Sequence, residues 1–280
     1  MKIVECPRDA MQGLSTFIPT EKKIDYINSL IKVGYDIIDF GSFVSSKLVP
    51  QMRDTVEVIQ GLELQDSTSL LSIVLNKRGA VEASSFEQID IIGYPLSVSE
   101  IFQQKNSKKT IESSLLLIDE IQDICIKKNK TLLIYFSMAF GNPYGEYWDV
   151  ELLLSYIQKI EEKCIKMISL EDTIGSSTPK LVSSVFNTVI QNFNSLDIGL
   201  HLHSTPDETY EKISQAWDAG CNRFDVAIGG YGGCPFAQND LIGNLSTEKF
   251  VNFLTKKKIN HSLDLYAFEN ACNYAKKIFN

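Results

Sequence analysis

Eight short apolar runs, separated by segments with helical periodicity, constrain the fold of this 280-residue chain more than any other feature of its sequence. Runs rich in Ile, Leu and Val are typical of parallel strands that are buried on both faces. Strands that alternate with helices predict a parallel sheet with crossover helices. The runs lie at about 2–6, 36–41, 69–76, 89–96, 131–140, 167–172, 197–204 and 223–229.

The segments between the runs carry apolar residues at the spacing of a helix. In 21–33, Ile27 and Leu30 belong to one apolar stripe, with Thr20 as the predicted N-cap and Gly34 as the predicted end. Similar stripes cover 111–125, 149–163, 179–190 and 208–219.

Eight strand–helix repeats predict a closed (β/α)8 barrel, or TIM barrel. An open doubly wound sheet is the alternative, but no GxGxxG motif follows the first run. We expect a single domain over 1–280, with the barrel at about 1–245 and extra C-terminal helices at about 246–280. Because barrel active sites lie at the C-terminal ends of the strands, the polar residues there are the candidates for function.

The chain carries 27 Lys and Arg residues against 35 Asp and Glu residues, a formal net charge of −8. This balance excludes a general electrostatic attraction to nucleic acid or to an anionic membrane. No apolar run approaches the ~18 residues that span a bilayer, and residues 1–9 do not resemble a secretory signal. The six cysteines are scattered without a CxxC pair, which is typical of free thiols, so we expect a cytoplasmic protein.

His201 and His203 end the seventh predicted strand, with one residue between them. Alternation along a strand points both imidazoles to the same side, which at the mouth of a barrel is the inner side. Neutral imidazole is a common ligand of divalent metals, so the pair indicates a metal site. The alternative is two polar residues at a strand end without a shared role.

Asp9 lies just after the first predicted strand, which in a closed barrel stands near the seventh. Its carboxylate can therefore meet His201 and His203 across the mouth. Asn244, which follows the eighth strand in a Gly-rich stretch, can add its carbonyl oxygen. Two nitrogens, a carboxylate, an amide oxygen and two open positions predict an octahedral site for Mg²⁺ or Mn²⁺, with zinc as the second choice.

Arg8 adjoins this predicted site and can hold a positive charge over an oxygen that becomes negative in a transition state. The alternative is an ion pair with a strand-end acid such as Glu171. Cys234 follows Gly232 and Gly233 in the loop after the eighth strand. A thiol on such a loop over a metal site is a candidate acid or base.

These residues lie in motifs that resemble the 3-hydroxy-3-methylglutaryl-CoA lyase family, a metal-dependent group of TIM barrels that also includes isopropylmalate synthase and related aldolases and synthases. The likeness spans about residues 2–256. Its landmarks are CPRDAMQG at 6–13, GSFVSSKLVPQMRDT at 41–55, SEIFQQKN at 99–106, SMAFGNPYGE at 137–146, ISLEDTIGSSTP at 168–179, HLH at 201–203 and GGCPFAQ to GNLSTE at 232–248. The second landmark together with GGCP separates the lyases from the Claisen-type synthases.

The resemblance implies roles position by position. The implied metal ligands are Asp9, His201, His203 and Asn244. Arg8 corresponds to a residue that stabilises an oxyanion, and Cys234 to a loop residue that takes part in proton transfer. Asp39 stands near the metal where the family usually has a glutamate, and Asp172 matches an acid of the sixth strand that lies in the pocket.

The chain departs from the family pattern in three places. The sequence STPD at 204–207 replaces Asp-Thr-Tyr-Gly after the two histidines, Glu171 replaces a usual glycine, and the loop between Cys234 and Asn244 is one residue longer. The missing acid after the histidines removes one potential partner for a ligand imidazole.

The implied reaction is the retro-Claisen cleavage of 3-hydroxy-3-methylglutaryl-CoA to acetyl-CoA and acetoacetate. Asp39 or His203 is expected to take the hydroxyl proton. Lys47 and Lys105, in loops after the second and fourth strands, can offset the protein's negative charge near the CoA phosphates, unless they are only solvated surface residues.

Two other functions are the alternatives to this reaction. The first is an aldolase or Claisen-type synthase that uses the same metal site on another acyl-CoA or 2-oxo acid. The second is a barrel that has lost catalysis and only binds a partner. Barrels of this group often pair, so a homodimer is one candidate for the assembly.

Overall fold

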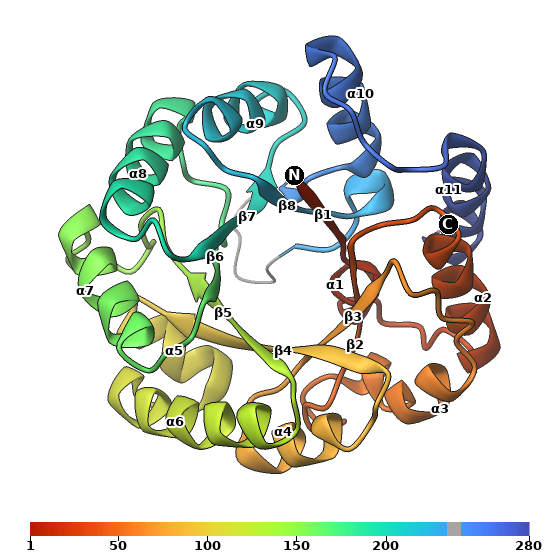
Figure 1. Ribbon diagram of the computed structural model, residues 1–280, viewed down its shortest axis with the longest axis horizontal. Coiled ribbons are helices and arrows are strands. Elements are labelled where there is room, and N and C mark those ends of the chain that lie inside the picture. Colours follow the sequence, from red (N-terminus) through yellow and green to blue (C-terminus); the bar gives the residue numbers. More distant parts are fainter. Residues whose placement is uncertain (234–241, 280) are drawn as a thin grey trace.

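The computed structural model describes residues 1–233 and 242–279, and its parallel strands close into a barrel surrounded by helices (Figure 1). Each of the first eight described strands pairs in parallel with its neighbours in the chain, and the eighth pairs with the first. The predicted (β/α)8 barrel is therefore confirmed. The strands are β1 (Lys2–Glu5), β2 (Ile37–Ser42), β3 (Ser69–Ile73), β4 (Ile89–Ser97), β5 (Thr131–Ser137), β6 (Met167–Asp172), β7 (Asp197–Ser204) and β8 (Arg223–Val226).

The strands are buried on both faces, as their continuous apolar runs predict. One apolar cluster fills the space between the strands and the helices. A smaller cluster fills the barrel interior and includes Val4, Leu71 and Tyr135. The fully buried Arg223 also lies in this interior beside Gly199, where an added Cβ would come within 2.7 Å of the guanidinium carbon.

The five helices predicted from apolar stripes are all present, as α2, α6, α7, α8 and α9. The predicted N-cap of α2 was wrong: Thr20 is the first residue of that helix, and its hydroxyl donates to Asp54. Apart from α1 (Pro7–Gln12), the α-helices that follow β1 to β7 are α2 (Thr20–Ile31), α3 (Thr55–Gln60), α4 (Lys77–Ser84), α5 (Glu100–Ser107), α6 (Ile111–Lys127), α7 (Val150–Glu161), α8 (Pro179–Asn192) and α9 (Thr209–Asp218). Short 3-10 turns follow β2, as η1 (Pro50–Met52), and β8, as η2 (Ile228–Gly230).

Two short elements at the barrel mouth were not predicted. Helix α1 (Pro7–Gln12) begins directly after β1, with a proline at its first position, where the missing N–H costs nothing. Strand β9 (Gly243–Asn244) pairs antiparallel with β7 and places Asn244 opposite His203. Both elements bring polar residues to the ends of the barrel strands.

The C-terminal helices α10 (Thr247–Lys257) and α11 (Leu265–Phe279) pack on the outside of the barrel (Figure 1). Helix α10 contacts α9, and α11 contacts α2, where Phe279 meets Tyr26 edge to face at 6.2 Å. Among the described residues, no helix combines the length and apolar character needed to cross a membrane.

Candidate metal centre and active site

A cavity of about 700 Å³ opens at the C-terminal ends of the barrel strands. It is lined by α1, by the last residues of β3, β5, β6 and β7, and by Gly232 and Gly233 after β8. Its ionisable lining residues within the described ranges include Arg8, Asp9, Lys105, Glu171, His201 and His203. This is the end of a barrel where catalytic residues are expected.

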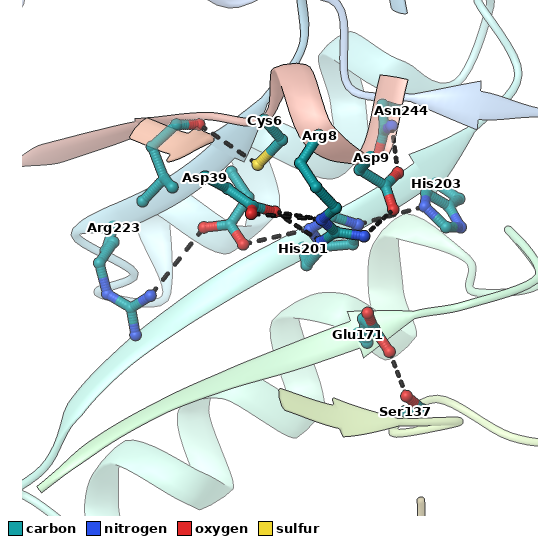
Figure 2. Close-up of polar contacts among 12 residues, drawn as sticks. Cys6, Arg8, Asp9, Asp39, Ser137, Glu171, His201, His203, Arg223 and Asn244 are labelled. Atoms are coloured by element: carbon teal, nitrogen blue, oxygen red, sulfur yellow. Dashed lines mark hydrogen bonds and ion pairs between the residues drawn. The ribbon is translucent and has the colours of Figure 1, made fainter. Parts of the chain in front are cut away.

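His201 and His203 extend from β7, and their Nε2 atoms approach each other (Figure 2). Each ring has an acceptor at its Nδ1 atom. Nδ1 of His201 lies 3.1 Å from a carboxylate oxygen of Asp225, and Nδ1 of His203 lies 2.8 Å from the backbone carbonyl of Thr173. These acceptors place the proton of each neutral ring on Nδ1 and leave a lone pair on Nε2. The two Nε2 atoms are 3.2 Å apart, so their lone pairs repel each other unless a cation lies between them.

Asp9 completes this cluster from α1. One carboxylate oxygen of Asp9 and one ring nitrogen from each of His201 and His203 lie within 4.8 Å of one another, and all three side chains are buried. Two imidazole nitrogens and a carboxylate oxygen are suitable ligands for a divalent cation. The residues present therefore fit the predicted metal.

The electrostatics of the cluster also favour a cation. Burial alone would raise the pKa of Asp9, but Arg8 and the two imidazoles lower it to about 2, so the carboxylate is ionised. Burial would lower the pKa of His201, but the hydrogen bond to Asp225 and the nearby carboxylates, including Glu171, raise it to about 9. The site therefore holds excess negative charge that a proton or a metal ion can balance.

A second group of three candidate ligands lies deeper in the barrel and consists of Cys6, His201 and Asp225. Burial and the surrounding carboxylates raise the pKa of the Cys6 thiol well above its ordinary value, so the thiol stays protonated. A protonated thiol is a poor metal ligand. The cluster with Asp9 is the better candidate.

Asn244 reaches Asp9 from β9, but through its amide nitrogen. Nδ2 of Asn244 donates to a carboxylate oxygen of Asp9 at 2.6 Å and to the carbonyl of Tyr231 at 2.8 Å. The residue predicted as an oxygen ligand therefore supports Asp9 in this structure. Its carbonyl oxygen would face the cluster only after the amide plane turns over.

Arg8 is fixed by carboxylates on both sides. Its Nε and Nη2 donate to Asp39, with the shortest of these contacts at 2.5 Å, and its Nη1 donates to Asp9 and Gln12 at 3.0 Å each. Burial lowers the pKa of Arg8, but Asp39 and Asp9 outweigh burial and raise it, so the cation is permanent. Of the five guanidinium N–H groups, one on Nη2 has no partner among the described residues, and Arg8 lines the cavity.

Of Asp39 and His203, the two groups expected to take a proton from a substrate, His203 lines the described cavity and Asp39 does not. Asp39 is 1% exposed, lies behind Arg8, and is not among the described residues that line the cavity. Burial raises its pKa to about 6 against the opposing effect of Arg8. The carboxylate therefore orients Arg8 and does not face the cavity.

Asp172 also requires a correction, because it does not line the described cavity. Its carboxylate accepts from the backbone N–H groups of Ser176 and Ser177 and lies 3.6 Å from Nζ of Lys212, so it orders the loop after β6. The alternation of a strand places its neighbour Glu171 on the inner side instead. Glu171 lines the cavity and accepts a hydrogen bond from Ser137.

Two further predicted residues, Lys105 and Lys47, do not belong to this ligand cluster. Lys105, on α5, lines the cavity, and its ammonium lies 4.3 Å from the ring centre of Tyr144. Lys47 is exposed and is not one of the described lining residues. Cys234 falls outside the described residues.

Asp225 and Thr173, which hold the two histidines, were missed by the sequence reasoning. An acid inside the buried run 223–229 was a usable signal, because a buried carboxylate requires a partner. The partner follows from the register of β7 against β8, which places His201 opposite Asp225 and cannot be deduced from the sequence alone. Because both histidines have acceptors, the missing acid after them in the sequence leaves neither ring unsupported.

A parallel barrel with an Asp–His–His cluster and a fixed arginine at its C-terminal mouth is the arrangement of a metal-dependent barrel enzyme. The chain belongs to the HMGL-like family, whose model matches residues 2–274. The resemblance inferred from the sequence motifs is thus confirmed.

Relatives from bacteria and mammals match nearly the whole chain. Hydroxymethylglutaryl-CoA lyase YngG of Bacillus subtilis is 31% identical over 96% of this chain and 89% of its own length. The cytoplasmic 3-hydroxy-3-methylglutaryl-CoA lyase of Homo sapiens is 32% identical over 100% of this chain and 75% of its own length.

Solved structures agree in fold at a similar level of identity. The HMG-CoA lyase of Brucella melitensis has a TM-score of 0.92 at 31% identity, covering 99% of this chain and 97% of that one. An HMG-CoA lyase from Acinetobacter baumannii, in complex with coenzyme A and 3-methylmalate, has a TM-score of 0.91 at 30% identity, covering 99% and 90%.

Proposed function

We propose that this chain cleaves 3-hydroxy-3-methylglutaryl-CoA to acetyl-CoA and acetoacetate. The observation that carries the proposal is the meeting of Asp9, His201 and His203 beside Arg8 in one cavity. Membership of the HMGL-like family and the names of its relatives supply the substrate. The complex of a similar lyase with coenzyme A supports an acyl-CoA as the ligand class.

Asp9, His201 and His203 would hold a divalent metal, and we propose Mg²⁺ or Mn²⁺ because the cluster leaves positions open for oxygen ligands. Asn244 would join them if its amide turned over. When bound, such an ion lowers the pKa of a substrate hydroxyl and orients the acyl chain.

Arg8 supplies the stabilising charge in this scheme. Breaking the carbon–carbon bond leaves its electron pair on the thioester fragment as an enolate, whose oxygen is negative. Arg8 lines the cavity, and one of its N–H groups has no partner among the described residues. Its hydrogen bonds to Asp39 hold the guanidinium in this position. A cation held in place before the reaction stabilises this charge without reorganisation.

We further propose Cys234 as the group that protonates the enolate carbon. It follows Gly232 and Gly233, which line the cavity, and a thiol can deliver a proton over a metal site. Cys234→Ala should lower kcat while leaving the metal content unchanged. Loss of metal from this variant would instead indicate a structural role.

We propose the cytoplasm as the compartment. The cysteines within the described ranges, Cys6, Cys125, Cys164, Cys221 and Cys272, are all free thiols. Free thiols persist in a reducing environment.

The test of the proposed function is a coupled assay for acetyl-CoA and acetoacetate from 3-hydroxy-3-methylglutaryl-CoA. We expect stoichiometric formation of both products by the metal-loaded protein and none after chelation. Condensation of acetyl-CoA with a 2-oxo acid, without cleavage of the thioester, would assign the chain to the synthases instead.

A further inference from the structure

Lys212 on α9 is a fully buried cation that the proposed reaction leaves without a task. Its side chain is 0% exposed, although a buried charge costs free energy unless it is paired. Its ammonium lies 3.6 Å from a carboxylate oxygen of Asp172 and 3.3 Å from one of Glu208, and it donates to the backbone carbonyl of Gly175 at 3.4 Å. Of the two carboxylates, that of Asp172 is also buried, so the pair of Lys212 and Asp172 lies inside the protein.

This pair closes the segment 173–178, which joins β6 to α8 (the β6 loop). The Asp172 carboxylate accepts from the backbone N–H of Ser176 at 3.0 Å and from that of Ser177 at 3.2 Å. Before these contacts the chain turns at Gly175, whose φ of +67° favours glycine. Lys212 binds the carboxylate at the start of the loop and the carbonyl of Gly175 within it, so one ammonium holds both parts of the turn.

The β6 loop contacts His203 at two points. The backbone carbonyl of Thr173 accepts from Nδ1 of His203 at 2.8 Å. At Gly175, an added Cβ would lie 3.2 Å from the backbone carbonyl oxygen of His203. The Thr173 hydroxyl accepts from the N–H of Met138 at 2.8 Å, so the chain after β5 anchors the start of the loop, whereas Lys212 anchors its middle. Release of the middle would therefore let the loop move against His203.

We propose that Lys212 is a positioning residue that holds the β6 loop in the shape in which Thr173 orients His203 toward a metal ion. This role depends on the metal site of the proposed function. Lys212 is not among the described residues that line the cavity, so it acts through the loop and not by contact with the ion or the substrate. A ligand imidazole needs an acceptor for its second ring nitrogen to fix its orientation, and the Thr173 carbonyl is that acceptor.

Equilibrium titrations of Lys212→Met and Asp172→Asn with Mn²⁺ test this role. The first change removes a positive charge from the pair and the second removes a negative charge, but both release the β6 loop. Replacing outer partners of metal ligands costs about 10–100-fold in affinity, and we expect the lower end, about 10-fold weaker Mn²⁺ binding, in both variants because the effect passes through the loop. Shifts of opposite sign would show that the pair acts only through its charges and would overturn the inference.

Lys23→Met is the matched control for the loss of a buried pair. The side chain of Lys23, on α2, is 2% exposed, and its ammonium lies 2.6 Å from a carboxylate oxygen of Asp54. Lys23 lies outside the described lining of the cavity, so Lys23→Met should lose comparable stability and keep the wild-type affinity for Mn²⁺. An equal loss of affinity in Lys23→Met would make the effect a general consequence of destabilisation and would contradict the proposed role.

Hydrogen exchange without metal supplies a second readout. In Lys212→Met, peptides that cover 173–178 should exchange their amide hydrogens faster than in wild type, whereas Lys23→Met should leave them unchanged. If Lys212→Met does not fold, Asp172→Asn carries both measurements with the same expected results. Wild-type exchange across the β6 loop, or wild-type affinity for Mn²⁺, in the folded variants overturns the inference alone. Absence of Mn²⁺ binding by wild type overturns the proposed metal centre as well.

Discussion

Arg8 owes its fixed position to Asp39 on one side and to Asp9 on the other. Replacing Arg8 by Gln removes the charge while the side chain remains polar, so the fold should survive. Loss of a preorganised charge stabiliser costs about 10²–10³ in rate. We therefore expect kcat of Arg8→Gln to fall by that factor in steady-state assays, and a kcat near that of wild type would exclude Arg8 from the transition state.

Asp225 acts on the site through His201, whose Nδ1 it holds at 3.1 Å. Outer partners of this kind typically change metal affinity by about 10–100-fold when they are replaced. We expect Asp225→Asn to weaken Mn²⁺ binding by that factor in equilibrium titrations. Asp197→Asn is the control, because Asp197 pairs with Arg223 at the opposite end of β7; equal affinities of the two variants would contradict a role for Asp225.

At the scale of elements, Glu5 ties β1 to the segment after β8 and to α10. It accepts from the backbone N–H of Ile228 at 2.8 Å and from the hydroxyl of Thr247 at 2.7 Å, and it is fully buried. Burial raises the pKa of Glu5 from 4.5 to about 8, against the effect of these hydrogen bonds. The folded protein therefore holds one more proton than the unfolded chain between about pH 4.5 and 8.

This difference makes the free energy of unfolding depend on pH. The contribution of Glu5 is complete below pH 4.5 and is lost as the pH rises toward 8. Glu5→Gln carries no such proton, so its stability relative to wild type should improve steadily from about pH 5 to about pH 8. Urea unfolding of both proteins at each pH checks this expectation, and parallel stability profiles would refute it.

The elements differ in how well the sequence predicts them, for physical reasons. The eight strands were predictable because a strand buried on both faces needs a continuous apolar run. Helix α1 was not, because it is only 6 residues long and most of it is buried by the barrel mouth, so no amphipathic stripe marks it. The cap of α2 failed because Thr20 donates to Asp54, a contact between residues distant in the chain.

The residues of the candidate site also differ in how well the sequence predicts them. His201 and His203 were predictable from alternation within one strand, and Asp9 from the closure of a barrel. The choice between Glu171 and Asp172 was not, because the two adjacent acids differ only in which face of β6 they occupy. A shift of the strand register by one residue would move each side chain of β6 to the opposite face of the sheet. The register is set by the pairing of β6 with β5 and β7.

At the scale of the whole molecule, the proposed ion would connect distant parts of the chain and stabilise the fold. Ligand binding to the folded state alone adds about 2.7 kcal/mol at a free concentration roughly 100 times Kd. For a chain of this size we expect Tm to rise by several degrees with Mn²⁺ and to fall again with EDTA. Asp9→Asn should abolish this shift, and a shift of equal size in that variant would place the ion elsewhere.

The seam where β1 meets β8 lies beside the cluster, with Asp9 on one side of it and the β7 histidines on the other. During synthesis, the aspartate emerges long before its two imidazole partners. A nascent chain therefore has no complete ion-binding centre until seven of the eight strands have been made. Binding of the ion therefore indicates that the barrel has closed. Folding intermediates that contain only half of the barrel lack the complete site and cannot catalyse the reaction.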